Sequence, residues 1–174
     1  MTWIFNPADL KTVDLKDIAP GDIFYPLQAG SSCELWLRLA GEDSELAILC
    51  LAGEKAYQVW QLNPLSKFSV LRIAEGKNLR LEIQEKNGIG SFKYEPGELF
   101  IDEHGPHLVA QCKGDFGLMD PCYISLRTWE ESARVNSNSK VSFSTWKLLD
   151  VSDPDNKKTL LSVGDWNDAP VIQP

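Results

Sequence analysis

The chain has 174 residues, of which 43% are hydrophobic and 24% are charged, and its 25 acidic residues outnumber the 17 basic ones. This length fits one domain with a substantial core, and the composition excludes disorder as the main state. Acids exceed bases by 12 to 9 in residues 1–90 and by 13 to 8 in residues 91–174. Because no basic stripe is available to neutralise phosphates, we expect neither nucleic acid nor an anionic membrane as a partner.

We expect residues 1–174 to form a single β-domain, with an irregular N-terminal segment at residues 1–18 and an irregular tail at residues 165–174. The first residues lack the basic region and long apolar region of a secretory signal. The longest strongly apolar run, Leu46–Ala52, is too short to cross a bilayer. These features predict a soluble, cytoplasmic protein.

The first expected element is a short helix or turn within residues 7–18. From residue 33 to residue 39, a cysteine and three leucines alternate with Glu34, Trp36 and Arg38. Because side chains alternate between the two faces of a strand, this pattern predicts one apolar face and one polar face that includes Trp36. Helical spacing would instead scatter the leucines around the cylinder.

Three apolar segments follow, at residues 46–52, 57–62 and 68–73. Each is short, rich in β-branched or aromatic residues and bounded by Gly, Pro or Asn, which is typical of strands covered on both faces. Turn residues at 41–44 and 53–55 predict that consecutive strands in this region pair as hairpins.

The pair Asn87-Gly88 is the strongest turn signal in the chain. Both residues accept a positive φ, which a type I′ turn requires. The turn therefore predicts a hairpin between residues 79–85 and 89–94. In the first of these strands Arg80 alternates with leucines, so we expect its side chain to face water.

The second half of the chain continues the pattern of short strands. A short helix is expected at residues 128–134, because Thr128 is followed three residues later by Glu131 in a capping-box pattern. The total of about eleven or twelve short strands predicts an all-β fold with one or two short helices. An antiparallel, jelly-roll-like β-sandwich and a closed β-barrel both fit. The further strands are expected at residues 98–102, 107–112, 141–149 and 158–163, with turns at 95–97, 104–106 and 152–156.

Both histidines of the protein lie in the hexapeptide at residues 102–107. A hairpin here can bring His104 and His107 together, and Asp102 or Glu103 can complete a site for a divalent metal. A metal-dependent enzyme centred on the two histidines is therefore one hypothesis. The Gly-Pro pair between them is itself turn chemistry, so the competing interpretation is that both rings point into solvent.

The four cysteines, at positions 33, 50, 112 and 122, are expected to be reduced structural thiols. Cys112 and Cys122 lack Cys-x-x-Cys spacing, so the sequence gives a zinc site little support. Cys112 and His107 are five residues apart and fall on opposite faces of one strand, which argues against a nucleophilic Cys–His pair. We predict no catalytic residue, and no cofactor apart from the divalent metal of the histidine hypothesis.

Six tryptophans are a larger number than a chain of this size usually carries. Trp36 and Trp146 alternate with polar residues, so their rings can lie on partly polar strand faces. Exposed aromatic rings stack on sugars or anchor protein interfaces, whereas inward-facing rings simply fill the core. The predicted ligand or interface residues are Trp36, Trp60 and Trp146.

Taken as a whole, the sequence favours binding or assembly without catalysis. Edge strands of such a fold must be covered or charged, and self-association or a protein partner is a frequent way to cover them. A carbohydrate-binding or small-molecule-binding domain that uses the surface tryptophans is the alternative. The metal-dependent enzyme comes third, because no catalytic motif accompanies the histidines.

Overall fold

The computed structural model describes residues 11–27, 34–41, 46–63, 65, 67–84, 95–114, 117–132, 141–164 and 166. In these residues the chain forms fourteen β-strands, two short 3₁₀ turns and no α-helix. The strands make three antiparallel sheets, and none of them closes into a barrel. The all-β prediction is confirmed, a sandwich-like arrangement fits, and the closed-barrel alternative is wrong. None of the described segments forms a helix with the length and hydrophobicity that a membrane crossing would need.

The first sheet has six strands, and both of its faces are covered near the middle. Leu35 and Leu37 point into the main core as predicted. Trp36 points to the other face, also as predicted, but this face is buried by a second apolar cluster. The order of strands is β1 (Lys11–Asp14), β6 (Ser69–Ala74), β2 (Ile23–Pro26), β3 (Leu35–Arg38), β4 (Leu46–Ala52) and β5 (Val59–Leu62).

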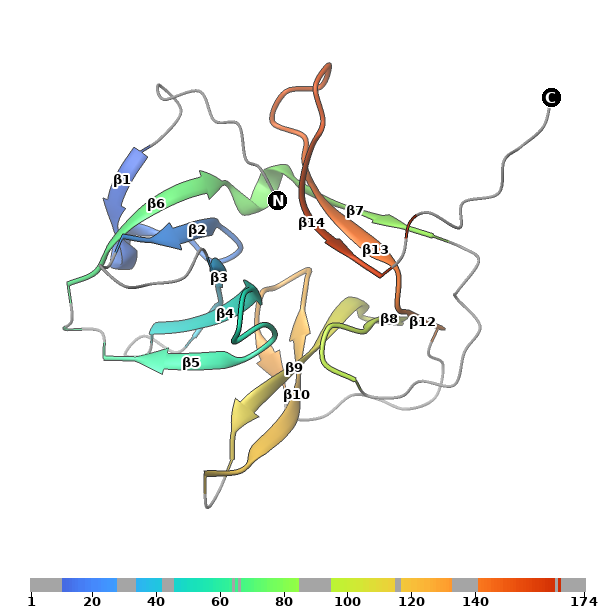
Figure 1. The fold of residues 1–174 in the computed structure, drawn as a ribbon, viewed down its shortest axis with the longest axis horizontal. Coiled ribbons are helices and arrows are strands. Elements are labelled where there is room, and N and C mark those ends of the chain that lie inside the picture. The colour runs from blue at the N-terminus through green and yellow to red at the C-terminus, as the bar shows by residue number, and fades with distance from the viewer. Residues whose placement is uncertain are drawn as a thin grey trace.

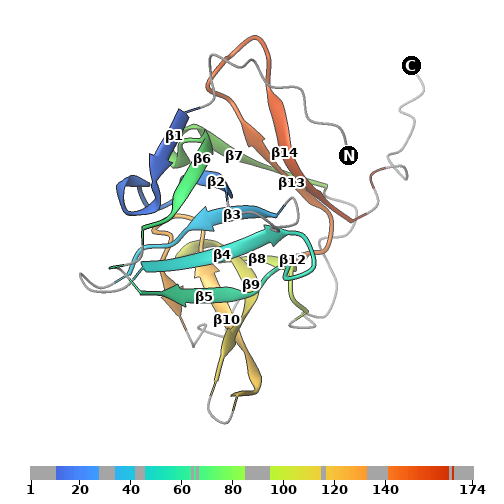
Figure 2. The same ribbon diagram turned by 60° about the vertical axis from the view of Figure 1, so that its left-hand side comes forward.

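Five strands form the second sheet and three form the third. The long β9–β10 hairpin and the β13–β14 hairpin project at opposite ends of the molecule in both views (Figures 1 and 2). The five-stranded sheet has the order β11 (Glu131–Ser132), β10 (Met119–Ser125), β9 (Gly105–Lys113), β8 (Leu99–Asp102) and β12 (Val141–Phe143). The three-stranded sheet has the order β14 (Lys158–Val163), β13 (Trp146–Asp150) and β7 (Leu79–Ile83).

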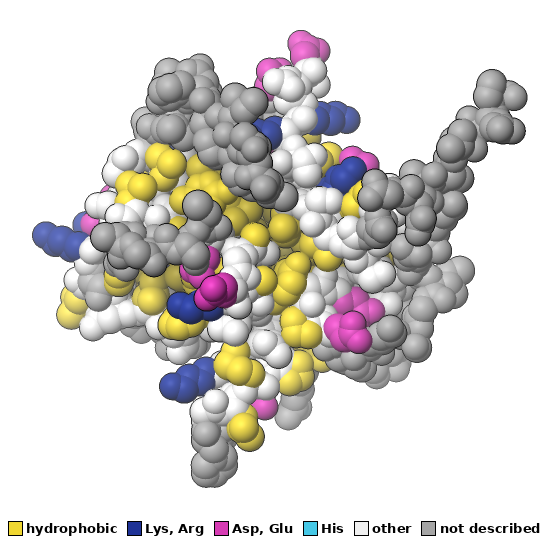
Figure 3. Space-filling model, viewed as in Figure 1, with side chains coloured by type: hydrophobic (Ala, Val, Ile, Leu, Met, Phe, Trp, Pro, Cys, Tyr) yellow, Lys and Arg dark blue, Asp and Glu magenta, His cyan; other side chains and the backbone are white. Residues whose placement is uncertain are grey.

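Two isolated parallel bridges join the six-stranded sheet to the five-stranded sheet. Ala40, just after β3, pairs with Glu130, and Gln58, just before β5, pairs with Gln111 of β9. Leucines and other apolar residues from all three sheets fill a common core between them. In Figure 3, hydrophobic side chains gather in the middle of the face, between the six-stranded sheet and the β13–β14 hairpin. The sheets therefore pack around one interior.

Strand pairing confirms four predicted hairpins, namely β3–β4, β4–β5, β8–β9 and β13–β14. The burial predicted for both faces of β4 is also confirmed, whereas β5 exposes Trp60 and Gln61 because it lies at the end of its sheet. The Asn87-Gly88 turn lies outside the described residues. The partner that the structure shows for β7 is β13.

The helix predictions are wrong where the structure describes them. Residues 11–14, expected in an irregular or helical segment, form β1 and pair with β6, and only the single 3₁₀ turn η2 (Leu15–Asp17) follows. In the second predicted helix, Trp129 has a φ of +64°, and Glu131 already belongs to β11. Strand pairing with distant segments thus overrides the local capping-box signal.

The strand expected at residues 141–149 is divided between two sheets. Its first part, β12, pairs with β8, and its second part, β13, pairs with β7 and β14. The chain changes sheets at Ser144 and Thr145. The apolar positions change phase at this bend, from 141 and 143 before it to 146 and 148 after it, so the break lies where the alternation shifts.

Candidate functional site

The predicted metal residues lie around the β8–β9 turn, on the outer face of the five-stranded sheet. His107 Nε2 is 3.0 Å from Asp102 Oδ1, and both side chains are largely buried. The imidazole ring stacks on Phe100, with ring centroids 4.9 Å apart and planes inclined by 9°. Phe100 faces His107 across the strand pair, so the ring and its carboxylate partner are fixed by strand register.

Asp102 holds the turn together. Its Oδ1 accepts a 2.8 Å hydrogen bond from the backbone N–H of His104. Desolvation is the largest single influence and raises the pKa of Asp102, but the hydrogen bonds from His104 and His107 together outweigh it. The net result is that the pKa of Asp102 is lowered, so its carboxylate is the favoured form.

Glu103 and His104 are separate from this buried pair. They project from the turn as exposed side chains, with His104 Nε2 3.5 Å from Glu103 Oε1. No three of the four predicted ligands, all of them described, bring their ligand atoms within 4.8 Å of one another. The structure therefore pairs Asp102 with His107 and leaves the two histidines without a common centre.

Beside this pair lies the acidic hollow, a depression of about 680 Å³. Ser125 stands directly opposite His107 on β10, and its Oγ accepts a hydrogen bond from the Thr128 N–H at 3.2 Å. Four carboxylates reach the walls, and Arg127 is the one basic side chain among the lining residues. The hollow is defined by Asp102, Glu103, His104, His107, Glu130 and Glu131.

Two of the three predicted tryptophans are core residues. Trp146 is 1% exposed, and its Nε1 donates a 2.9 Å hydrogen bond to the carbonyl of Gly97. Trp36 is buried, and its ring meets Trp60 edge-on at 6.4 Å. Trp60 alone of the three is exposed, at 38%, and Lys55 Nζ lies 4.6 Å from its ring centroid.

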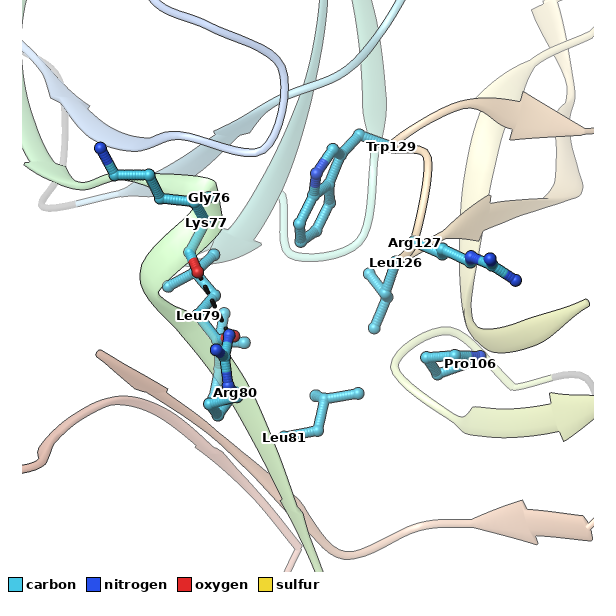
Figure 4. Close-up of a pocket in the computed structure, with 10 residues that line it drawn as sticks. Gly76, Lys77, Leu79, Arg80, Leu81, Pro106, Leu126, Arg127 and Trp129 are labelled. Atoms are coloured by element: carbon cyan, nitrogen blue, oxygen red, sulfur yellow. Dashed lines mark hydrogen bonds between the residues drawn. The ribbon is translucent and has the colours of Figure 1, made fainter. Parts of the chain in front are cut away.

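A hollow that the sequence did not predict lies between the three-stranded and five-stranded sheets, beside the turn η3 (Gly76–Asn78) that follows β6 of the six-stranded sheet. We call it the three-sheet cleft. It has a volume of about 510 Å³. Figure 4 shows apolar side chains from β7 and from the β10–β11 turn facing the cavity, with the arginines toward its edges. The cleft is defined by Leu81, Pro106, Leu126 and Trp129, with Arg80 and Arg127 at its rim.

Trp129 forms the wall of the cleft next to the six-stranded sheet. Its backbone N–H donates to the Ser125 carbonyl and its own carbonyl accepts from Ala40, both at 2.8 Å. A φ of +64° is strained for a bulky side chain and persists only where surrounding contacts impose it. The indole packs so closely on Gly21 that a Cβ there would lie 2.4 Å from Trp129 Nε1.

The basic residues around the cleft differ in their partners. Lys77 Nζ lies 2.6 Å from Glu75 Oε2, so this ammonium group is already neutralised. Arg80 donates to the backbone carbonyls of Lys77 and Leu79, at 3.2 and 2.7 Å. Within the described part of the chain, neither Arg80 nor Arg127 pairs with a carboxylate. Two charged guanidinium groups therefore remain available beside an apolar cavity.

A third hollow, the Trp60 groove, separates β5 from the β9–β10 hairpin. It has a volume of about 640 Å³ and is lined by Trp60, Gln61, Cys112, Met119 and Glu131. The sequence singled out Trp60 by residue type, but nothing in it indicated Cys112 or Glu131 as neighbours. The three-sheet cleft gave no sequence signal either, because its residues come from four separate segments.

Comparison with known proteins returns no relative: no family model, curated protein or solved structure matches this chain. The chemistry of the hollows therefore carries the functional argument.

Proposed function

We propose that the protein acts by binding, and that its ligand is an organic anion with an apolar body, held in the three-sheet cleft. The observation that carries this proposal is the pair of arginines without carboxylate partners, Arg80 and Arg127, at the rim of an apolar cavity. In a chain with an excess of acids, a basic side chain usually has an acid within reach. Two arginines that form no ion pair with a carboxylate, both on one cavity, favour an anionic ligand.

The chemistry of the cleft supports this class of ligand. A guanidinium group presents a planar fork of donors that matches carboxylate, phosphate or sulfonate oxygens. Leu81, Leu126 and Trp129 offer apolar contact, worth about 25 cal/mol for each Å² of ligand surface removed from water. Cavities lined by apolar groups with a few placed polar groups are the usual form of small-molecule sites.

Two fluorescent probes that differ in charge test the proposal. 8-Anilinonaphthalene-1-sulfonate has an apolar body with a sulfonate, and N-phenyl-1-naphthylamine has a similar body without charge. We expect the double variant Arg80→Gln/Arg127→Gln to bind the anionic probe about five- to tenfold more weakly, since each exposed ion pair contributes at most about 1 kcal/mol. Binding of the neutral probe should stay unchanged.

The control is Lys157→Gln, which removes one positive charge from the exposed β13–β14 turn. It should bind both probes as the parent protein does. Octanoate should displace the anionic probe, and octanol should displace it far less well. Equal binding of the anionic probe by the double variant and the parent would refute the proposal.

Self-association is the second candidate function, and the open edge of β5 favours it. In the described residues this strand ends its sheet, and the β-bridge nearest to it on the β9 side is Gln58–Gln111, just before the strand. No proline, lysine or bulge protects residues Val59–Leu62, although such devices are usual on exposed edges. Trp60 and Met119 are partly exposed beside this edge, and both residue types are enriched at protein interfaces.

Light scattering after gel filtration tests this second candidate, with a second copy of the chain as the partner. We expect the parent protein to form a dimer that Trp60→Lys converts to a monomer. Leu65→Lys is the matched control, because Leu65 is 87% exposed and lies outside the Trp60 groove. A parent protein that stays monomeric at high concentration would exclude assembly through this edge.

A further inference from the structure

Two cysteines and a glutamate come together where the inner face of the five-stranded sheet reaches the Trp60 groove. Cys112 belongs to β9, Cys122 to β10 and Glu131 to β11. The two sulfur atoms and a carboxylate oxygen all lie within 4.8 Å of one another. In the described residues this is the one group of three His, Cys, Asp or Glu side chains with such spacing.

Strand register brings these side chains to the same face. Cys112 pairs with Asp120, two residues before Cys122 on β10, so the cysteines are diagonal neighbours. Glu131 pairs with Ile124, two residues after Cys122, and therefore shares its face. The arrangement is fixed by three adjacent strands and involves no loop, which makes its geometry well defined.

The three side chains lie close enough together to influence one another's charge. Desolvation by burial raises the pKa of both cysteines, so both thiols are neutral in the metal-free protein.

We propose that Cys112, Cys122 and Glu131 bind one divalent metal ion of the zinc class. Two sulfur ligands and one carboxylate oxygen suit zinc, which is borderline soft and accepts both kinds of donor. On binding, the two thiols release their protons to solvent and the metal accepts two thiolates and a carboxylate, with no electron transfer. Three protein ligands leave one position of a tetrahedral site for water or another group.

Burial around the site gives the metal a route of entry. Cys122 is fully buried, Cys112 is partly exposed and Glu131 is exposed. Cys112 and Glu131 both line the Trp60 groove, so an ion can reach them from solvent.

This metal site is independent of the three-sheet cleft, which contains none of its residues. It also differs from the histidine hypothesis, since neither His104 nor His107 belongs to it. His107 points to the outer face of the sheet and Cys112 to the inner face, as their spacing of five residues predicts.

Titration with cobalt(II) tests the site directly, because cobalt bound to thiolate absorbs in the near ultraviolet by sulfur-to-metal charge transfer. The protein is first reduced with a phosphine and freed of metal. We expect one equivalent of cobalt to produce the band and zinc to abolish it by displacement. Cys112→Ser and Glu131→Gln should each weaken binding by at least about tenfold.

Three control variants test whether cobalt binding depends on the proposed ligands and not on other acids, histidines or cysteines. Glu130→Gln changes the adjacent carboxylate, His107→Gln removes the buried histidine, and Cys50→Ala removes a cysteine of the second apolar cluster. All three should bind cobalt as the parent does. Circular dichroism verifies that each variant is folded.

The proposal is overturned if no thiolate band forms, or if Cys112→Ser binds cobalt with unchanged affinity. It is also overturned if His107→Gln abolishes the band, because the metal would then lie at the β8–β9 turn. None of these outcomes bears on anion binding in the three-sheet cleft, which the two naphthalene probes measure separately.

Discussion

The three-sheet cleft and the acidic hollow lie on opposite faces of the same two strands, yet their chemistry is opposite. Pro106 and Leu126 line the cleft, while their immediate neighbours His107 and Ser125 line the hollow. The cleft has an apolar wall with two arginines that form no ion pair with a carboxylate. The hollow has four carboxylates, one of which belongs to the buried pair of Asp102 and His107. Arg127 is the one residue that lines both.

This difference arises from the period-two geometry of strands, which sends neighbouring side chains to opposite faces. Acids and bases are distributed almost evenly along the chain, but the fold sorts them between the two faces. A molecule with a net charge of −8 can thereby present a local site for an anion. Net charge alone therefore excludes only partners that cover a large area, such as nucleic acid.

Substitution of Gly21 should disturb the structure of the three-sheet cleft and leave that of the acidic hollow unchanged. Gly21→Ala places a Cβ against the Trp129 indole at a φ of +89°. We expect it to lower the free energy of unfolding by about 2–4 kcal/mol, from backbone strain plus overpacking. Binding of the anionic naphthalene probe should fall with it, whereas the NMR signals of the His107 ring should not move.

Gly117→Ala is the matched control for this prediction. Gly117 has a φ of +76°, but a Cβ there would meet nothing within 4 Å. Its free energy of unfolding should therefore fall only by the backbone strain of a left-handed alanine, about 1–2 kcal/mol. Equal losses in the two variants, measured by urea denaturation, would mean that the Trp129 contact contributes nothing.

Asp102→Asn should affect the hollow and leave the cleft intact. The variant loses the charged partner of His107, and we expect a loss of about 1.5 kcal/mol in the free energy of unfolding at pH 7. Because the pKa of Asp102 is lowered in the folded state, the carboxylate stabilises the protein above its unfolded-state pKa. That contribution disappears as pH falls through the folded-state pKa.

Urea denaturation over a series of acidic pH values measures both effects. The parent protein should lose stability below about pH 4, the unfolded-state pKa of an aspartate, more steeply than the variant does. Glu103→Gln changes an exposed neighbouring carboxylate and should behave as the parent. If the free energy of unfolding fell equally steeply with decreasing pH in Asp102→Asn and in the parent, the assigned role of Asp102 would be contradicted.

Arg127→Gln is expected to have the smallest effect on stability. Its side chain is exposed, so the free energy of unfolding should change by less than about 0.5 kcal/mol. Affinity for the anionic probe should fall about two- to fivefold, and less at high salt because exposed charges are screened. An unchanged affinity would place the anion contact at Arg80 alone.

The predicted His–Asp neighbourhood could be recognised from the sequence because it is local. Asp102 and His107 belong to one hairpin, and the turn at Glu103 and His104 between them fixes their register. The exposure of Arg80 and the opposite faces of Cys112 and His107 followed from alternation in the same way. By contrast, the helix expected at residues 128–134 fails because Ala40 and β10 pair with that segment from elsewhere in the chain.

The two core tryptophans show a second limit of alternation. Trp36 does lie on the face that the pattern assigns to it, but the second apolar cluster covers that face. Trp146 follows serines in the sequence, yet the chain turns into another sheet just before it. Alternation reports the face of a strand, and it does not report what packs against that face.

The sequence by itself determined the all-β class, most hairpins and the side of each strand on which a residue lies. Those properties depend on backbone geometry and on turn residues close in the chain. Only the tertiary structure decided which faces are buried, how Arg80 comes to share a cavity with Arg127, and how Cys112 meets Glu131. These are contacts between distant segments, and the local periodicity of the sequence carries no information about which distant strands become neighbours.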